Sequence, residues 1–344
     1  MESRYHETGR KTAPRRQDRD GLLLPDGKER QAMKAIGVRK ATDRIRDMEE
    51  LDVPVKPAGN TELLVEVHSV GLNPADYRTF TSLSTMGLEL PFVGGYDFSG
   101  VVADMGPEVR GYHLGQAVYG KIPSGGATAE YVTVDQKYAA PRPESLSHSQ
   151  AAVIPIPIQT AYWYLVRQGH LQAGQSVLIL GGGGGVGSVA IMLAKELGAK
   201  VAATGFAKHI PLMKAAGADI VIDVEKGEWD LLDEKVDLLL DTVGMSALPE
   251  AISHVRDGGT VLAMTLPAMP DPPITDNRTL HWVLFSGAKP DGEVLLLANR
   301  LVEKGVYKPS FEREVDFSAA GMIDGLSSIW EHRKKGRIVM KVKP

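Results

Sequence analysis

Cysteine is absent from the 344 residues. Its absence excludes disulfides, thiolate catalysis, iron–sulfur clusters and every zinc site built on cysteine ligands. Long apolar runs are also lacking, since no uninterrupted stretch approaches the ~20 residues needed to span a bilayer and the first residues lack the apolar core of a secretory signal. We therefore expect a cytoplasmic protein with no membrane partner.

The chain also lacks an excess of positive charge. The formal net charge is −4 and the pI is about 6.2, so no general field attracts a polyanion and nucleic acid is not the expected partner. With 43% apolar residues the chain can bury a large core, and its length favours two domains over one. A globular enzyme is the expected class.

Residues 1–32 form the part of the chain least suited to folding. They mix Arg, Lys, Asp, Glu and Gly with little apolar periodicity, which predicts a flexible N-terminal tail. An Arg-rich leader is the alternative, but transit peptides are poor in acids and this stretch contains Glu2, Glu7, Asp18 and Asp20. We expect the folded part to begin near Met33.

The pattern of apolar and turn residues changes at about Ser176. Before it, from Met33 to about Gln150, short β-type runs such as "ELLVEVHSVGLNP" and "YDFSGVVADMG" are broken by Gly and Pro, which predicts a β-rich, barrel-like domain. After it, short apolar strands such as "SVLIL", "KVAATG" and "KVDLLLDTVG" alternate with helical segments. This alternation predicts a doubly wound parallel sheet covered on both faces, that is, an α/β Rossmann arrangement.

A glycine-rich turn stands between the first of these strands and the helix that follows. Gly182, Gly184 and Gly187 satisfy G-x-G-x-x-G, with Gly185 and Val186 inside the same turn. In this pattern glycine permits the tight turn, the approach of the backbone to a pyrophosphate, and close packing of helix on strand. We predict a dinucleotide site here; the alternative is a flexible glycine loop with no ligand.

The end of the next strand bears on the choice of dinucleotide. Enzymes that use NAD place an acid there to bind the ribose 2′-hydroxyl. Here the segment from Thr204 to His209 has no carboxylate, and Lys208 offers a positive charge to a 2′-phosphate. The segment therefore predicts NADPH as cofactor, unless Lys208 is only an exposed residue that opens the next helix.

Several blocks of sequence together resemble the medium-chain dehydrogenase/reductase superfamily, in its zinc-free quinone oxidoreductase and enoyl reductase branch. The resemblance extends from about Met33 to the C-terminus and rests on "VGLNPADY", "PFVGGYDFSGVV", "GGATAEYVTV", the segment with the glycine-rich turn, "AAGADIVID" and the closing "GRIVMKV". It implies a GroES-like catalytic domain of residues 33–153 and 306–344, with the Rossmann domain of residues 154–305 inserted between its two parts. It also implies a homodimer, for which Thr279 to Ser286 is the candidate edge strand.

Zinc-dependent relatives place three catalytic ligands at positions that here read Asn73, Tyr96 and Ile156, which cannot build a tetrahedral zinc site. The nine histidines offer no ligand spacing in compensation. We therefore predict an enzyme without a metal, in which hydrogen-bond donors stabilise the carbonyl that gains charge.

The resemblance assigns Tyr77 to the loop that faces the nicotinamide, where its phenol would stabilise an oxyanion or relay a proton. The competing hypothesis makes Tyr77 a wall residue and takes the proton from water. Arg78 would add a fixed charge and Asn73 an amide donor, while Asp76 would orient Arg78 or Tyr77. The residues from Thr79 to Leu90 would line the cleft.

The remaining cofactor residues follow from the resemblance and from strand ends. Thr160 matches a threonine that packs on the nicotinamide, although it could be a hydroxyl at the N-terminus of a helix. Val243 and Thr265 follow parallel strands, where ligands of open α/β sheets lie, and we expect backbone contacts from both.

The predicted function is hydride transfer from NADPH to a quinone or an α,β-unsaturated carbonyl. Two alternatives stay open at this point. One is a stand-alone enoyl reductase for carrier-bound or coenzyme A-bound chains. The other is an NADPH-binding sensor or scaffold without useful turnover, because binding and catalysis use different residues.

Overall fold

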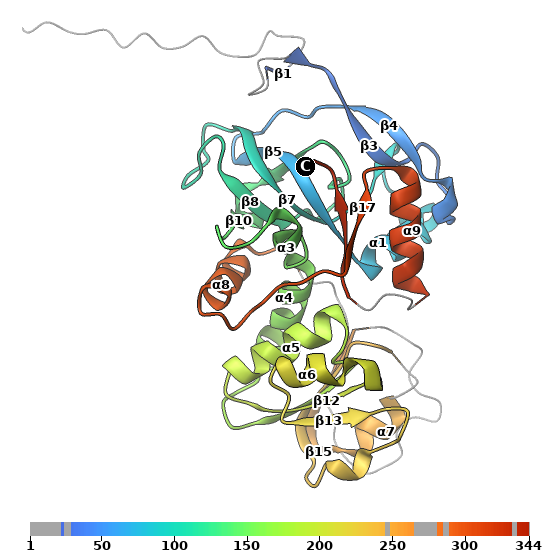
Figure 1. The fold of residues 1–344 in the computed structure, drawn as a ribbon, viewed down its shortest axis with the longest axis vertical. Coiled ribbons are helices and arrows are strands. Elements are labelled where there is room, and N and C mark those ends of the chain that lie inside the picture. The colour runs from blue at the N-terminus through green and yellow to red at the C-terminus, as the bar shows by residue number, and fades with distance from the viewer. Residues whose placement is uncertain are drawn as a thin grey trace, which may run out of the picture.

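We describe the fold from a computed structural model. The structure describes residues 22–23, 29–244, 248–264, 281–284, 289–331 and 336–343. Figure 1 shows a part rich in strands above a smaller layered α/β part, with helices α3, α4 and α8 between them. No helix in the described ranges is both long and apolar enough to cross a membrane.

The strand-rich part is built from both ends of the chain. Its seven-stranded sheet has the order β10-β8-β7-β5-β18-β17, with β9 also paired to β5. Five of its strands come from residues 62–141, but β18 (Ile338–Lys341) lies between β5 (Glu62–Leu72) and β17 (Arg313–Asp316). The other strands are β7 (Asp97–Met105), β8 (Ala117–Lys121), β9 (Tyr131–Asp135) and β10 (Ala139–Pro141). Both ends of the chain thus contribute strands to one sheet, while the domain bounds implied by the resemblance stay a prediction.

A three-stranded sheet completes this part, with the order β4-β3-β6. Its strands are β3 (Ala32–Val38), β4 (Glu49–Pro54) and β6 (Phe92–Val93). Ahead of it, β1 (Leu22–Leu23) pairs antiparallel with β2 (Glu29–Arg30). This pair lies inside the segment predicted to be a flexible tail, so that prediction was too broad; residues 1–21 lie outside the described ranges.

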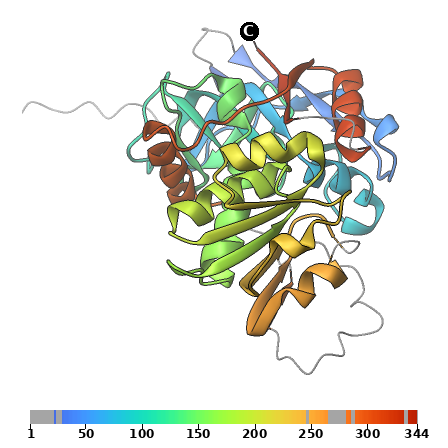
Figure 2. The ribbon, with the colours of Figure 1, turned by 60° about the horizontal axis from the view of Figure 1, so that its bottom comes forward.

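The second part is a six-stranded parallel sheet of order β13-β12-β11-β14-β15-β16. The strands are β11 (Ser176–Leu180), β12 (Lys200–Gly205), β13 (Ile220–Asp223), β14 (Val236–Asp241), β15 (Val255–Ala263) and β16 (His281–Leu284). Helices α5 (Gly185–Glu196), α6 (Ile210–Ala215) and α7 (Leu248–Ser253) connect them. The predicted doubly wound sheet is confirmed, and Figure 2 shows its strands side by side.

The helices between the two sheets make their cores continuous. They are α3 (His148–Ala152), α4 (Pro155–Tyr162) with a π-helical extension (Trp163–Gln168), and α8 (Gly292–Glu303). One apolar cluster contains Tyr119 of β8, Ile158 of α4, Leu193 of α5 and Leu295 of α8. Because these side chains are buried together, the two sheets share a packed interface.

Two further helices flank the strand-rich part. Helix α1 (Pro74–Phe80) packs against α9 (Ala319–Trp330), and the short α2 (Leu83–Met86) follows α1. Residues 74–80 were predicted to be part of a loop, and that prediction was wrong. Asn73 caps the helix, Pro74 is its first residue, and the Asn73 backbone amide donates to Oδ2 of Asp76 at 2.7 Å. This reciprocal capping stabilises the first turn.

Candidate active site

The glycine-rich turn joins β11 to α5 as the sequence predicted. Gly184 caps α5, which begins at Gly185. The positive backbone angle falls on Gly181 (φ 77°), one residue before the motif, so the tight turn depends on Gly181. A Cβ on Gly187 would lie 2.1 Å from the carbonyl oxygen of Gly181, so Gly187 allows the helix to pack on the strand. Of the three roles expected of glycine, the tight turn is therefore assigned to Gly181 and the close packing of helix on strand to Gly187.

Two side chains from other elements lie against this turn. A Cβ on Gly183 would lie 2.4 Å from the ring of His209, the residue that precedes α6. A Cβ on Gly185 would stand 2.9 Å from Nη1 of Arg337, which precedes β18. The turn is thus a cradle that any side chain would fill, with an imidazole and a guanidinium beside it.

The segment after β12 carries the residues predicted to select the dinucleotide. Thr204 is buried, and its Oγ1 accepts a hydrogen bond from the Gly181 amide at 3.4 Å. Lys208 is exposed, with its Nζ 6.0 Å from the centre of the Phe206 ring. A carboxylate does lie on the neighbouring strand: Asp223 ends β13, is 1% exposed, accepts from the Glu225 amide and lies 3.8 Å from Lys226. Its charge is therefore already compensated.

The strand ends around the turn place the other predicted cofactor residues. Val243 is 54% exposed, and its side chain would be 2.4 Å from a Cβ on Gly181. Its amide donates to Asp241 Oδ1 at 2.9 Å. Thr160 is buried in the second turn of α4, so it is not a hydroxyl at a helix N-terminus. Thr265 lies outside the described residues.

Asn73 is the centre of a buried hydrogen-bond network. Its Nδ2 donates to the Gly71 carbonyl at 2.9 Å and to Asp97 Oδ2 at 3.1 Å, while its Oδ1 accepts from Arg337 Nη2 at 2.8 Å. Asp97 Oδ2 also accepts from the Ile156 amide of α4 at 3.0 Å. Both amide hydrogens of Asn73 are engaged, so its predicted role as a donor to substrate is not supported by this geometry.

The carboxylates of Asp76 and Asp97 are 1% and 0% exposed. Burial raises the pKa of each to about 7, although Arg337 acts in the opposite direction on both. Each carboxylate raises the other's proton affinity, so the two titrate as a pair. In the described part of the molecule, Oδ1 of each is buried without a hydrogen-bond partner. Asp76 was predicted to orient Arg78 or Tyr77, but its cationic neighbour is Arg337.

Tyr77, the leading catalytic candidate, lies on α1 in contact with α9. Its ring stacks on Trp330 with a centroid distance of 4.4 Å and an angle of 7°. Arg78 is exposed on the same helix. The three predicted catalytic residues, Asn73, Tyr77 and Arg78, therefore lie within two helical turns of one another.

The positions that hold zinc in zinc-dependent relatives are occupied by other contacts. Tyr96 Oη and Thr79 Oγ1 are 2.7 Å apart, and the Ile156 amide is bonded to Asp97. Across the described residues, no group of three or more His, Asp or Glu side chains could hold a metal ion.

The segment predicted to line the cleft is part helix and part loop. Thr79 and Phe80 end α1, and Leu83 to Met86 form α2. Met86 is 48% exposed and Leu90 is 43% exposed. Phe80 and Leu83 of the same segment are buried, so only part of its apolar content is at the surface.

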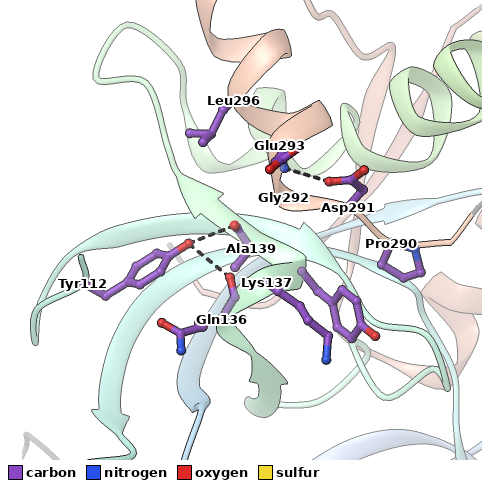
Figure 3. Close-up of a pocket in the computed structure, with 10 residues that line it drawn as sticks. Tyr112, Gln136, Lys137, Ala139, Pro290, Asp291, Gly292, Glu293 and Leu296 are labelled. Carbon is purple, nitrogen blue, oxygen red and sulfur yellow. Dashed lines mark hydrogen bonds between the residues drawn. The ribbon is translucent and has the colours of Figure 1, made fainter. Parts of the chain in front are cut away.

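A shallow pocket of about 400 Å³ lies elsewhere, between β10 and the start of α8. Figure 3 shows Tyr112, Gln136 and Lys137 on one side and Asp291, Glu293 and Leu296 on the other. The Tyr112 hydroxyl already donates to the carbonyls of Gln136 and Ala139. None of the predicted site residues lines this pocket, so we assign it no part in the chemistry.

Comparison with known proteins places this geometry in a family. Residues 59–144 match the alcohol dehydrogenase GroES-like domain, and residues 185–287 match the zinc-binding dehydrogenase domain. The chain is 34% identical over 302 residues to a 2-methylene-furan-3-one reductase from Solanum lycopersicum, covering 85% of this chain and 74% of that protein. It is 32% identical over 302 residues to a chloroplastic NADPH-dependent alkenal/one oxidoreductase from Arabidopsis thaliana, covering 85% and 75%.

The chain belongs to the medium-chain dehydrogenase/reductase superfamily. It lies in the quinone oxidoreductase-like branch of that superfamily. The quinone oxidoreductase from Coxiella burnetii superposes with a TM-score of 0.79 at 26% identity, covering 91% of this chain and all of that one. The chain is therefore an oxidoreductase of the superfamily, and its cofactor is of the nicotinamide class.

The residues present fit a nicotinamide dinucleotide of the kind that medium-chain dehydrogenases bind. The turn from Gly182 to Gly185 leaves room that a Cβ would fill, and the amide dipoles of the twelve-residue helix α5 begin there. Arg337 brings a positive charge to Gly185. An anion at this place would meet backbone donors and a guanidinium together.

Three residues of this medium-chain dehydrogenase/reductase site were not predicted from the sequence. They are Asp97, His209 and Arg337. The signal for Arg337 was available, because it stands in the closing "GRIVMKV" block that carried the resemblance. Asp97 stands in another such block and His209 beside Lys208, but nothing in the sequence pairs either of them with its contact.

Proposed function

We propose that this protein reduces a quinone or the activated double bond of an α,β-unsaturated carbonyl, with NADPH as hydride donor and without a catalytic metal. One observation carries the proposal: Arg337 contacts the glycine-rich turn on one side and Asn73 of the catalytic domain on the other. The nucleotide cradle and the start of α1 are thereby held in one network. The names of the relatives support an enone, alkenal or quinone as the acceptor.

The bound cofactor supplies the hydride. The backbone of the glycine-rich turn and Arg337 would hold the diphosphate, and Lys208 with His209 would pair with a 2′-phosphate. Thr160, buried on α4, would pack on the nicotinamide. These contacts would orient the hydride donor.

Water is the proton source we infer for the reduced carbon. Asn73 has no free amide hydrogen, and the Tyr77 ring is held against Trp330. Neither of these contacts involves a residue of the glycine-rich turn. Solvent delivers the proton without a dedicated acid, which is one of the two mechanisms left open by the sequence.

The absence of a catalytic metal is part of the proposal. It rests on Asn73, Tyr96 and Ile156, whose polar groups bond to protein atoms and offer no tetrahedral donor set. Steady oxidation of NADPH with a panel of quinones, cyclic enones and alkenals tests the whole proposal. We expect turnover that is unchanged after dialysis against a chelator; failure to turn over any acceptor, or restoration only by a divalent metal, would overturn it.

The cofactor preference is a separate prediction. We expect kcat/KM for NADPH to exceed that for NADH, because no free carboxylate follows β12 and Lys208 can pair with the 2′-phosphate. Lys208→Glu should lower kcat/KM for NADPH by about tenfold or more and leave the NADH value nearly unchanged. Lys214→Glu on α6 is the matched control, since Lys214 is also exposed. A parent enzyme that prefers NADH would contradict the assignment.

A further inference from the structure

The buried carboxylates of Asp76 and Asp97 raise a question of charge balance. Both lie at the catalytic end of the strand-rich part, and the guanidinium of Arg337 is a single positive charge for two carboxylates. One Oδ1 atom of each carboxylate is buried without a hydrogen-bond partner among the described residues. Two carboxylates beside one cation tend to retain a proton between them.

A second cation stands on the adjacent strand. Lys121 is the last residue of β8 and is the register partner of Asp97, the first residue of β7. Directly paired residues on neighbouring strands project to the same face of a sheet. Lys121 is partly buried, and Asp97 and Asp76 are the two groups that favour its charged form.

The charged and titratable groups around Asp97 come from five segments. They are Asp76 on α1, Lys121 on β8, Arg337 before β18, Tyr307 after α8, and Tyr96 before β7. Burial, and to a smaller degree the charge of Asp76, raises the pKa of Tyr96. Of these, only Lys121 and Arg337 are cations. With both present the two carboxylates can ionise together in a cluster without net charge.

We propose that Lys121 is a positioning residue for the reduction, whose ammonium favours the ionised form of Asp97, so that Asp97 fixes Asn73, and Asn73 fixes Arg337 beside the glycine-rich turn. This inference rests on the proposed function. Its steps are hydrogen bonds in the structure: Asp97 Oδ2 accepts from Asn73 Nδ2 at 3.1 Å and from the Ile156 amide at 3.0 Å, and Asn73 Oδ1 accepts from Arg337 at 2.8 Å. Bonds to an ionised acceptor are shorter and stronger than bonds to a neutral one, so protonation of Asp97 loosens the chain of contacts.

The test uses Lys121→Met, which removes the charge and keeps the aliphatic stem, and Lys121→Arg, which keeps the charge. NADPH affinity is measured by fluorescence titration, and kcat and KM by steady-state kinetics, from pH 6 to pH 9. At pH 7 we expect Lys121→Met to raise the Kd and KM for NADPH about tenfold with a smaller change in kcat. The acid limb of kcat/KM should move up by about one pH unit, so the loss shrinks toward pH 9. Lys121→Arg should stay within about threefold of the parent.

Infrared spectroscopy measures the protonation of the buried carboxyl groups directly. Infrared difference spectra should show a protonated carboxyl at pH 8 in Lys121→Met that is weaker in the parent and in Lys121→Arg. That signal should disappear in the double variant with Asp97→Asn. If Lys121→Met does not fold, Lys121→Gln takes its place with the same expectations.

Several outcomes would overturn the inference. They are equal NADPH affinity of Lys121→Met and the parent at every pH, a loss that does not change with pH, or a Lys121→Arg variant as weak as Lys121→Met. If the parent binds no NADPH at all, the proposed function fails instead, and the infrared comparison alone then decides whether Lys121 controls the ionisation of Asp97.

Discussion

Asn73 shows how far a single residue can be interpreted from sequence. Its position in "NPADYR" predicted a place in the active site, but in a loop, whereas Asn73 in fact precedes helix α1. Its amide was expected to face substrate, yet its bonding partners include Arg337, 264 positions away in the chain. The identity of a buried partner at that separation depends on the assembled sheets, so the local pattern could not reveal it.

Tyr77 gives a prediction at the same scale. Tyr77→Phe removes the phenol but keeps the ring that stacks on Trp330. Because we infer that water is the proton source, we expect kcat to change by less than about twofold, whereas loss of a general acid costs about tenfold or more. Steady-state kcat with a quinone and with an enone measures the difference, and a tenfold loss would restore Tyr77 to the mechanism.

His148 gives a prediction about pH and stability. Its ring stacks on His68 at 4.4 Å, and Nδ1 lies 2.8 Å from Ser99 Oγ. Burial, followed by the charges of His68 and Arg142, lowers the pKa of His148 to about 4. The unfolded chain therefore binds the proton first, so the stabilisation is complete above about pH 6.5 and is lost as the pH falls toward 4.

Thermal unfolding of the parent and of His148→Gln between pH 7 and pH 4 checks this. The parent should lose more stability than the variant over that range, by about 1 kcal/mol or more after allowance for partial solvation of the ring. Parallel curves for the two proteins would show that His148 does not titrate as described.

At the scale of elements, the strands of the nucleotide-binding sheet were predictable. Each is a short apolar run, because both faces of a parallel sheet are covered and no polar alternation is needed. The strand β17 and the helix α9 were missed. Strand β17 is only four residues long, with a single buried side chain, Val315, and its pairing partner β18 lies more than twenty residues further along.

The packing of α5 on β11 leads to a prediction for Gly187. A methyl group there would approach the Gly181 carbonyl oxygen to 2.1 Å, which forces the helix away from the strand. We expect Gly187→Ala to lower the free energy of unfolding by about 1 to 3 kcal/mol and to weaken NADPH binding. Urea unfolding and nucleotide titration measure both effects. Ser188→Ala on the same helix adds no atoms and should change neither; a stable Gly187→Ala variant with parental affinity would contradict the packing argument.

At the scale of the whole molecule, the described part of the nucleotide-binding sheet ends in β16, next to β15. The order of the strands leaves one side of β16 without a partner in the described chain. We propose that a second copy pairs there and forms a homodimer, since an open edge strand is a template for pairing. Light scattering should give about twice the 37.1 kDa of one chain. Hydrogen exchange at residues 281–284 should slow as protein concentration rises, and a monomer at all concentrations would refute the pairing.

The insertion of β18 between β5 and β17 has a consequence for the order of assembly. On the ribosome, the described strands of the nucleotide-binding sheet, the last of which ends at Leu284, are synthesised before β18 of the catalytic sheet. Arg337 immediately precedes that strand. The nascent chain therefore contains the glycine-rich turn early in translation and gains the guanidinium beside it only late. We expect the maturing protein to pass through a stage in which the nucleotide domain is formed and the active site is not yet whole.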